Sequence, residues 1–193
     1  MAKLKRSDLY SLEKYSEIRS EFRKKIIAHK QNRRVLLGEH LLLLFEDQLI
    51  MQYQVQEMLK AEKIFEAAGI EEELDAYNPL IPDGSNWKAT MMIQYEDLDE
   101  RKKMLGKLIG IEDKIYMQVE GFDKVFAIAD EDISRDNADK TSAVHFLRFE
   151  LDADMATAAK QGISIHAGVE HDKYSYTVKL TDNVRSSLVK DLD

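Results

Sequence analysis

Residues 47–67 read DQLIMQYQVQEMLKAEKIFEA, and this stretch carries the clearest structural signal in the chain. At about 100° per residue, its apolar side chains cover most of the helical circle and its polar side chains share one narrow stripe. The polar stripe consists of Gln52, Gln56, Lys60 and Lys63. Asp47 is a suitable N-cap, and Gly69 is a suitable end signal. The stretch therefore predicts a long central helix, from Asp47 to about Ala67, that is buried on most sides.

Polar side chains also interrupt the apolar arc of this helix. They are Gln54, Glu57 and Glu62, and Glu57 lies close to Tyr53 on the helical circle. A buried carboxylate is costly unless it is paired, hydrogen-bonded or bound to a metal. Two interpretations stay open. In the first, Tyr53, Gln54 and Glu57 face a pocket or a metal ion. In the second, Glu57 is structural and pairs with an arginine or with backbone amides of a loop.

The segment after this helix is a long loop over residues 77–87, and it contains both prolines of the chain and its sole tryptophan. Long loops in compact domains are often functional, so Asn78 and Trp87 are candidate walls of a ligand site. The alternative is an ordered loop in which Trp87 covers the edge of the core, because the Asn, Asp, Pro and Gly residues here match turn chemistry.

Strand patterns dominate the second half of the chain. Ile115–Val119 alternates apolar and polar residues, residues 121–124 form a turn into a further strand, and residues 144–151 alternate again. Residues 7–34 predict an N-terminal helix, and Leu41–Phe45 predicts a buried strand. The order of elements predicts an α+β fold, with a largely antiparallel sheet on which the N-terminal helices and the long buried central helix pack.

Charge is distributed unevenly over what we predict to be a single domain, residues 1–193. Residues 1–34 hold 11 Lys or Arg against 4 Asp or Glu, a net charge of +7. Residues 35–193 hold 17 against 32, a net charge of −15, so a basic helical N-terminal segment precedes an acidic body. We expect the basic helix to dock on the acidic body. The overall charge of −8 argues against binding of nucleic acid, which needs a cationic surface.

The lack of cysteine and of long apolar segments excludes several classes of protein. The chain has no cysteine, which rules out disulfides, Cys-ligated metal sites and Cys nucleophiles within it. The start of the chain lacks an apolar signal core, and its longest apolar run, Leu41–Phe45, is far below the roughly 20 residues that span a bilayer. We therefore expect a cytoplasmic protein that makes no contact with a membrane.

Residues 144–151 supply two further candidates. His145 shares its strand face with Leu147 and Phe149, so it points inward, as a satisfied core residue or as a metal ligand. Glu57 and His145 are weak candidates for such a metal site, since no spacing in the chain matches a known metal motif. Arg148 lies on the opposite face of the strand, where it is a candidate ligand contact or a partner for Glu57.

Several stretches together resemble a known family. They are LFED (44–47), YQVQEML (53–59), EELDAYNPLIP (72–82), NWKATMM (86–92) and SAVHFLRFEL (142–151). These stretches resemble the uncharacterised bacterial domain-of-unknown-function family 3501. The resemblance implies no established activity or cofactor. It implies iron-containing redox partners, a rubrerythrin-like non-haem iron protein and an iron–sulfur oxidoreductase, and so a role in oxidative stress.

Two hypotheses follow for the function. The first is an accessory or binding protein in a redox or oxidative-stress system that acts through iron-containing partners. The second is a small enzyme, or a ligand- or metal-binding domain, with its pocket between the central helix and residues 77–87. Its candidate ligand-binding residues are Tyr53, Gln54, Glu57, Asn78, Trp87 and Arg148. Whether the chain is an enzyme stays open, and a homodimer is expected from the frequency of dimers among soluble proteins.

Overall fold

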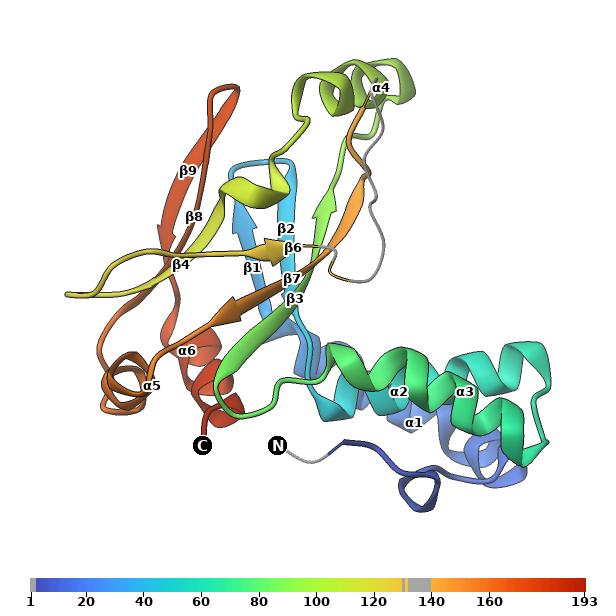
Figure 1. Cartoon of the computed structure of the whole chain (residues 1–193). Helices are drawn as coiled ribbons and strands as arrows, with labels where there is room; N and C mark the ends of the chain where they lie inside the picture. The colour runs from blue at the N-terminus through green and yellow to red at the C-terminus, as the bar shows by residue number, and fades with distance from the viewer. Residues whose placement is uncertain (1–2, 130, 132–139) are drawn as a thin grey trace.

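The computed structural model describes residues 3–129, 131 and 140–193, and its strands and helices are arranged in distinct parts (Figure 1). Two antiparallel sheets form one part of the molecule, and three long helices lie together beside them. The predicted α+β class is therefore confirmed. The antiparallel pairing is confirmed as well, but the strands are divided between two sheets where the sequence analysis expected one.

The first sheet has five strands. In spatial order they are β1 (Arg34–Leu37), β2 (Leu41–Phe45), β3 (Asn86–Ile93), β7 (Val144–Glu150) and β6 (Ile128–Ala129). The second sheet has four, in the order β5 (Val125–Phe126), β4 (Ile115–Val119), β8 (Ile165–His171) and β9 (Tyr174–Lys179). All pairings between these strands are antiparallel. The chain passes from one sheet to the other at Ala127, between β5 and β6.

The main core lies between the sheets. Alternation along β7 places His145, Leu147 and Phe149 inward, as the sequence predicted, and leaves Phe146 and Arg148 on the outer face. Trp87 is buried in the same core, where its indole nitrogen donates to the Leu188 carbonyl at 3.0 Å. Shorter helices close this part of the molecule. They are α4 (Leu98–Lys107), α5 (Ala153–Lys160) and α6 (Asp182–Leu188), with the 3₁₀ turns η3 (Glu112–Lys114) and η4 (Val189–Asp191).

The helical part consists of α1 (Leu12–Gln31), α2 (Gln48–Glu62) and α3 (Ala67–Tyr77), with the 3₁₀ turns η1 (Arg6–Asp8) and η2 (Asn78–Leu80). The central helix α2 packs between the other two. One side of it joins an apolar cluster with Leu74 of α3 and Leu4, and Leu49 and Tyr53 pack against a cluster on α1. No helix of the described ranges combines the length and apolarity needed to cross a membrane.

The helix boundaries differ from the predicted ones for local reasons. Asp47 caps α2 as expected, its Oδ1 accepting from the Ile50 amide at 2.9 Å, but the helix ends at Glu62. Lys63 adopts a left-handed conformation with φ of 56°, and the Ile64 amide then donates to the Leu59 carbonyl at 2.9 Å. This is the hydrogen bond of a Schellman end, so Gly69 is not the terminator that we predicted and lies inside α3.

The polar stripe of α2 is also different from the prediction, because Gln56 is completely buried. Its Oε1 accepts from the Tyr10 amide at 2.6 Å, and its Nε2 donates to the Tyr10 carbonyl at 3.3 Å. Gln52 Nε2 donates to the Asp8 carbonyl at 2.5 Å, and Lys60 Nζ donates to the Ser16 hydroxyl of α1 at 2.9 Å. The polar stripe is therefore the dock for the N-terminal segment, which satisfies its backbone polar groups there.

Candidate functional site

Glu57, the buried carboxylate predicted on the central helix, belongs to an ion pair between α1 and α2. Its two oxygens accept from Arg19 Nε and Nη2 at 2.8 and 2.7 Å, and Oε1 also accepts from the Tyr15 hydroxyl at 2.5 Å. These hydrogen bonds, Arg19 first, lower the pKa of Glu57, although partial burial acts to raise it. Arg19 thus takes the place that we considered for Arg148, and this pair joins the basic helix to the acidic body as expected.

The other predicted site residues are spread over the molecule. Tyr53 packs on Phe22 of α1, with ring centroids 6.0 Å apart, and Gln54 is half-buried on α2. The Asn78 side chain holds the N-terminal segment, accepting from the Leu4 amide at 2.8 Å and donating to its carbonyl at 3.0 Å. Trp87 is in the core between the sheets. Of this set, Tyr53 and Glu57 lie together on α2, where Tyr53 helps to lower the pKa of Glu57, and Asn78 and Arg148 line one cavity of 440 Å³.

His145, the second candidate for a metal, is fully buried and has polar neighbours. Its Nε2 lies 2.8 Å from Thr141 Oγ1, 3.1 Å from the Ser142 carbonyl oxygen and 3.9 Å from Glu112 Oε2. These contacts satisfy the imidazole within the fold. In the part of the chain that the structure describes, no group of three or more His, Asp or Glu side chains has an arrangement that could hold a metal ion.

A different pocket lies between α3–η2 and the outer face of the five-stranded sheet. Its floor is formed by Glu46, Lys88 and Arg148, which lie side by side on neighbouring strands. Glu46 directly follows β2, and its amide donates to the Lys88 carbonyl of β3 at 2.8 Å. Lys88 in turn pairs in register with Arg148 of β7. We call this the Glu46 pocket, and its volume is 320 Å³. Its walls are formed by Glu46, Asp75, Ala76, Pro79, Leu80, Lys88, Ala89, Glu131, Phe146, Leu147 and Arg148.

Glu46 is the unusual residue of this pocket. Its side chain is only 5% exposed, and Oε1 accepts from the Thr90 hydroxyl at 2.6 Å. Oε2 is equally buried but has no hydrogen-bond partner among the described residues. Burial raises the pKa of this carboxyl, and the neighbouring Asp47 adds to the rise, against the opposing effects of Thr90, Lys30 and Arg33. The lining of the pocket therefore includes a carboxyl group with one oxygen that has no hydrogen-bond partner among the described residues.

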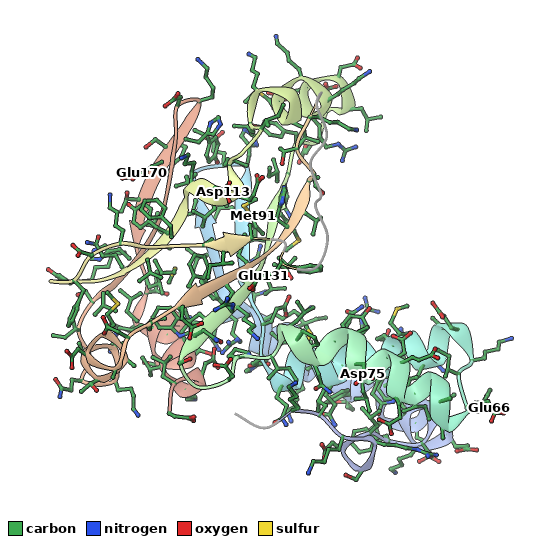
Figure 2. All side chains as sticks on the ribbon, in the orientation of Figure 1. Glu66, Asp75, Met91, Asp113, Glu131 and Glu170 are labelled. Atoms are coloured by element: carbon green, nitrogen blue, oxygen red, sulfur yellow. The ribbon has the colours of Figure 1, made fainter. Side chains whose placement is uncertain are left out.

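The two cations of the pocket are already engaged. Lys88 Nζ donates to the Pro79 carbonyl at 2.7 Å, and burial lowers the pKa of its ammonium group. Arg148 donates to both oxygens of Glu131, at 2.9 and 2.8 Å, and also pairs with Glu150. The bonds from Arg148 lower the pKa of Glu131. In Figure 2, Glu131 lies beside the sheet and Asp75 lies on α3, so carboxylates mark both sides of the pocket.

Sequence reasoning found Arg148 but missed Glu46 and Lys88. A signal for both was present. Glu46 is the charged residue directly after the buried run Leu41–Phe45 and directly before the cap Asp47, where the backbone leaves little freedom to reach solvent. Lys88 alternates with the buried residues Trp87 and Ala89, which places it on the opposite face of β3.

The fold and the site define a class: an α+β protein with two antiparallel sheets and a pocket whose floor holds a buried, half-satisfied carboxyl group. The chain belongs to the family described as "Protein of unknown function (DUF3501)", whose model matches residues 3–192. The family resemblance seen in the sequence is confirmed over nearly the whole chain.

A solved structure is similar over the full length. It is described as the crystal structure of a novel protein of unknown function from Burkholderia pseudomallei K96243, and its sequence is 48% identical to this chain. The two chains cover each other completely, with a TM-score of 0.94. A comparison with curated proteins gave no match.

Proposed function

We propose that the protein binds a small amphiphilic molecule in the Glu46 pocket. The observation that carries this proposal is the Glu46 carboxyl, buried to 5% exposure with one oxygen that lacks a partner in the described structure. Leaving a buried acceptor unsatisfied costs about 1–3 kcal/mol, and more for a charged group. A bound ligand that donates a hydrogen bond to Oε2 would remove this cost.

The shape and lining of the pocket suit such a molecule. Its 320 Å³ is in the lower part of the range of roughly 300–1,000 Å³ that is typical of small-molecule sites. Ala76, Leu80 and Phe146 supply apolar wall, and the polar groups gather in the row along the floor. A mainly apolar wall with a few convergent polar groups is the usual composition of a ligand site. This is the ligand-binding hypothesis of the sequence analysis, at a pocket that shares only Arg148 with the predicted set.

A fragment screen by ligand-observed NMR tests the proposal. Ala76 is exposed on α3 and lines the pocket, so Ala76→Trp fills the pocket without disturbing the core. Ala68→Trp is the matched control, because Ala68 is exposed on the same helix but is not part of the lining. We expect fragments that bind the wild type and Ala68→Trp and fail to bind Ala76→Trp. If every fragment that binds the wild type binds Ala76→Trp and Ala68→Trp equally well, the pocket is not a ligand site.

We further propose that this function is exercised in the bacterial cytoplasm, alongside iron-containing redox partners in oxidative stress. The support is the family resemblance, and the partners stay a prediction from it. Anaerobic co-purification from the host, with quantitative mass spectrometry of the captured proteins, is the test. Recovery of a rubrerythrin-like protein at a stoichiometric level would support the prediction, and its absence from repeated captures would count against it.

A further inference from the structure

We infer that the ligand of the Glu46 pocket is an organic cation of the protonated-amine or amidinium class, whose N–H groups donate to Glu46 Oε2. This inference rests on the proposed function of the pocket and specifies the chemistry of its ligand. The unpartnered atom of Glu46 is the oxygen Oε2, and the other carboxyl oxygen, Oε1, already accepts from Thr90 at 2.6 Å. Because an ionised carboxylate only accepts hydrogen bonds, the complementary group is a donor.

The cations of the pocket do not supply that donor and do not offer a site for an anion. Lys88 Nζ is bound to the Pro79 carbonyl at 2.7 Å. Arg148 lies between the carboxylates of Glu131 and Glu150, which neutralise it. An anionic ligand would have to displace these contacts, whereas a cationic ligand leaves them intact.

Charge around the pocket also favours a cation. Three carboxyl groups, those of Glu46, Asp75 and Glu131, face two basic side chains, Lys88 and Arg148, in its lining. Asp75 is exposed on α3, and Glu131 stands on the sheet side in Figure 2. Three acidic against two basic groups leave the lining with a formal excess of one negative charge, and a negative potential raises the local concentration of cations.

Because the Glu46 carboxyl is buried, the charged group of the ligand should contribute strongly to its affinity. A charge-assisted hydrogen bond is about twice as strong as a neutral one, and low dielectric around Glu46 strengthens it further. The carboxyl group must be ionised to form this pair, and the charged groups that act on it are Lys30, Arg33 and Asp47. Burial raises the pKa of the Glu46 carboxyl, and a cation beside it acts in the opposite direction.

Isothermal titration calorimetry with benzamidine and phenethylamine tests the inference, and benzamide and benzoate serve as the neutral and anionic analogues of benzamidine. We expect at least one cation to bind the wild type and Ala68→Trp, and Ala76→Trp to abolish its binding. In Glu46→Gln, which keeps an oxygen for Thr90, we expect affinity for the cation to fall about tenfold or more.

The outcomes separate this inference from the proposed function. If benzamide or benzoate binds in a manner that Ala76→Trp abolishes, and neither cation binds, the pocket is a ligand site but its ligand is not a cation. Equal binding of a cation to the wild type and Glu46→Gln also overturns the inference. If none of the four probes and none of the NMR fragments is sensitive to Ala76→Trp, the proposed function fails with it.

Discussion

Arg33 is the residue whose replacement should damage the fold most, because it is a buried charge shared by three parts of the chain. Its side chain is 1% exposed and follows α1. Nε donates to the Phe45 carbonyl at 3.0 Å and lies 3.3 Å from Asp47 Oδ2, and Nη2 donates to the Glu46 carbonyl at 2.9 Å. The other side of the guanidinium pairs with Asp191 near the C-terminus. We predict that Arg33→Met is strongly destabilising.

The size of the effect follows from these contacts. Removing one partner of a buried ion pair leaves an uncompensated charge and typically costs about 3–5 kcal/mol. Here Asp191, at 2% exposure, loses its guanidinium, and the Phe45 and Glu46 carbonyls lose donors as well. For a chain of this length each kcal/mol corresponds to about 2–4 °C, so the melting temperature should fall by roughly 6–20 °C.

Urea unfolding followed by Trp87 fluorescence provides the assay, because the single tryptophan is buried beside Leu188 of α6. Arg34→Met is the matched control, since Arg34 is the next residue and is exposed, and it should change the free energy of unfolding by less than about 0.5 kcal/mol. Replacing Asp191 by Leu in the Arg33→Met background should recover part of the loss. An Arg33→Met variant that loses less than about 1 kcal/mol, at unchanged slope with urea, would refute the reasoning.

Other predictions concern the remaining polar and glycine positions. Glu57→Gln should cost about 1–3 kcal/mol in thermal or urea unfolding through the weakened Arg19 contact, and should leave ligand binding in the Glu46 pocket unchanged. Burial raises the pKa of Asp191 to about 6 from an ordinary value of 3.8, so its contribution to stability is present at low pH and is lost as pH rises through that interval. The wild type should therefore lose up to about 3 kcal/mol relative to Asp191→Asn from pH 4 to pH 6, and parallel urea titrations that do not diverge would contradict this. Gly168→Ala places a Cβ about 2.3 Å from the Tyr116 ring and should cost about 1–3 kcal/mol, whereas a melting temperature equal to that of the wild type would show that the ring moves freely.

Elements with a strong local signal could be predicted from the sequence. The alternation of β7, the buried strand β2 and the cap at Asp47 all depend on the residues within a few positions, and each is confirmed. Contacts between segments that are distant in the sequence could not be predicted. The strand predicted after the turn at residues 121–124 divides between the two sheets at Ala127, since β5 pairs with β4 and β6 pairs with β7.

The polar stripe of α2 shows the same limit at the level of side chains. Periodicity alone assigns a glutamine on such a stripe to solvent, yet Gln56 is buried by Tyr10, whose backbone supplies both a donor and an acceptor. A primary amide is the side chain that matches a peptide group in both roles, so burial of Gln56 costs little. Nothing within the helix sequence indicates that a segment 46 residues earlier lies across it.

Glu57 carries the stronger sequence signal of a costly buried carboxylate, because it interrupts the apolar arc of a helix. Helix packing gives Glu57 an arginine, Arg19, and a tyrosine hydroxyl, so its cost is offset within the fold. Glu46 receives a single hydroxyl for its two oxygens. What distinguishes the two is the partner on another element, and partners of that kind become visible only when the elements are assembled.

The position of Glu46 is set by the same network that makes Arg33 sensitive. Its amide is bound to the Lys88 carbonyl, and its own carbonyl accepts from Arg33 at 2.9 Å. Both polar groups of its backbone are thus held, and the carboxyl cannot turn away without losing the hydrogen bond from Thr90. A buried acceptor on a backbone fixed in this way is preorganised for a ligand, and preorganisation lowers the entropic cost of binding. It follows that Arg33→Met, assayed below its melting temperature, should weaken cation binding in the Glu46 pocket although Arg33 does not line it.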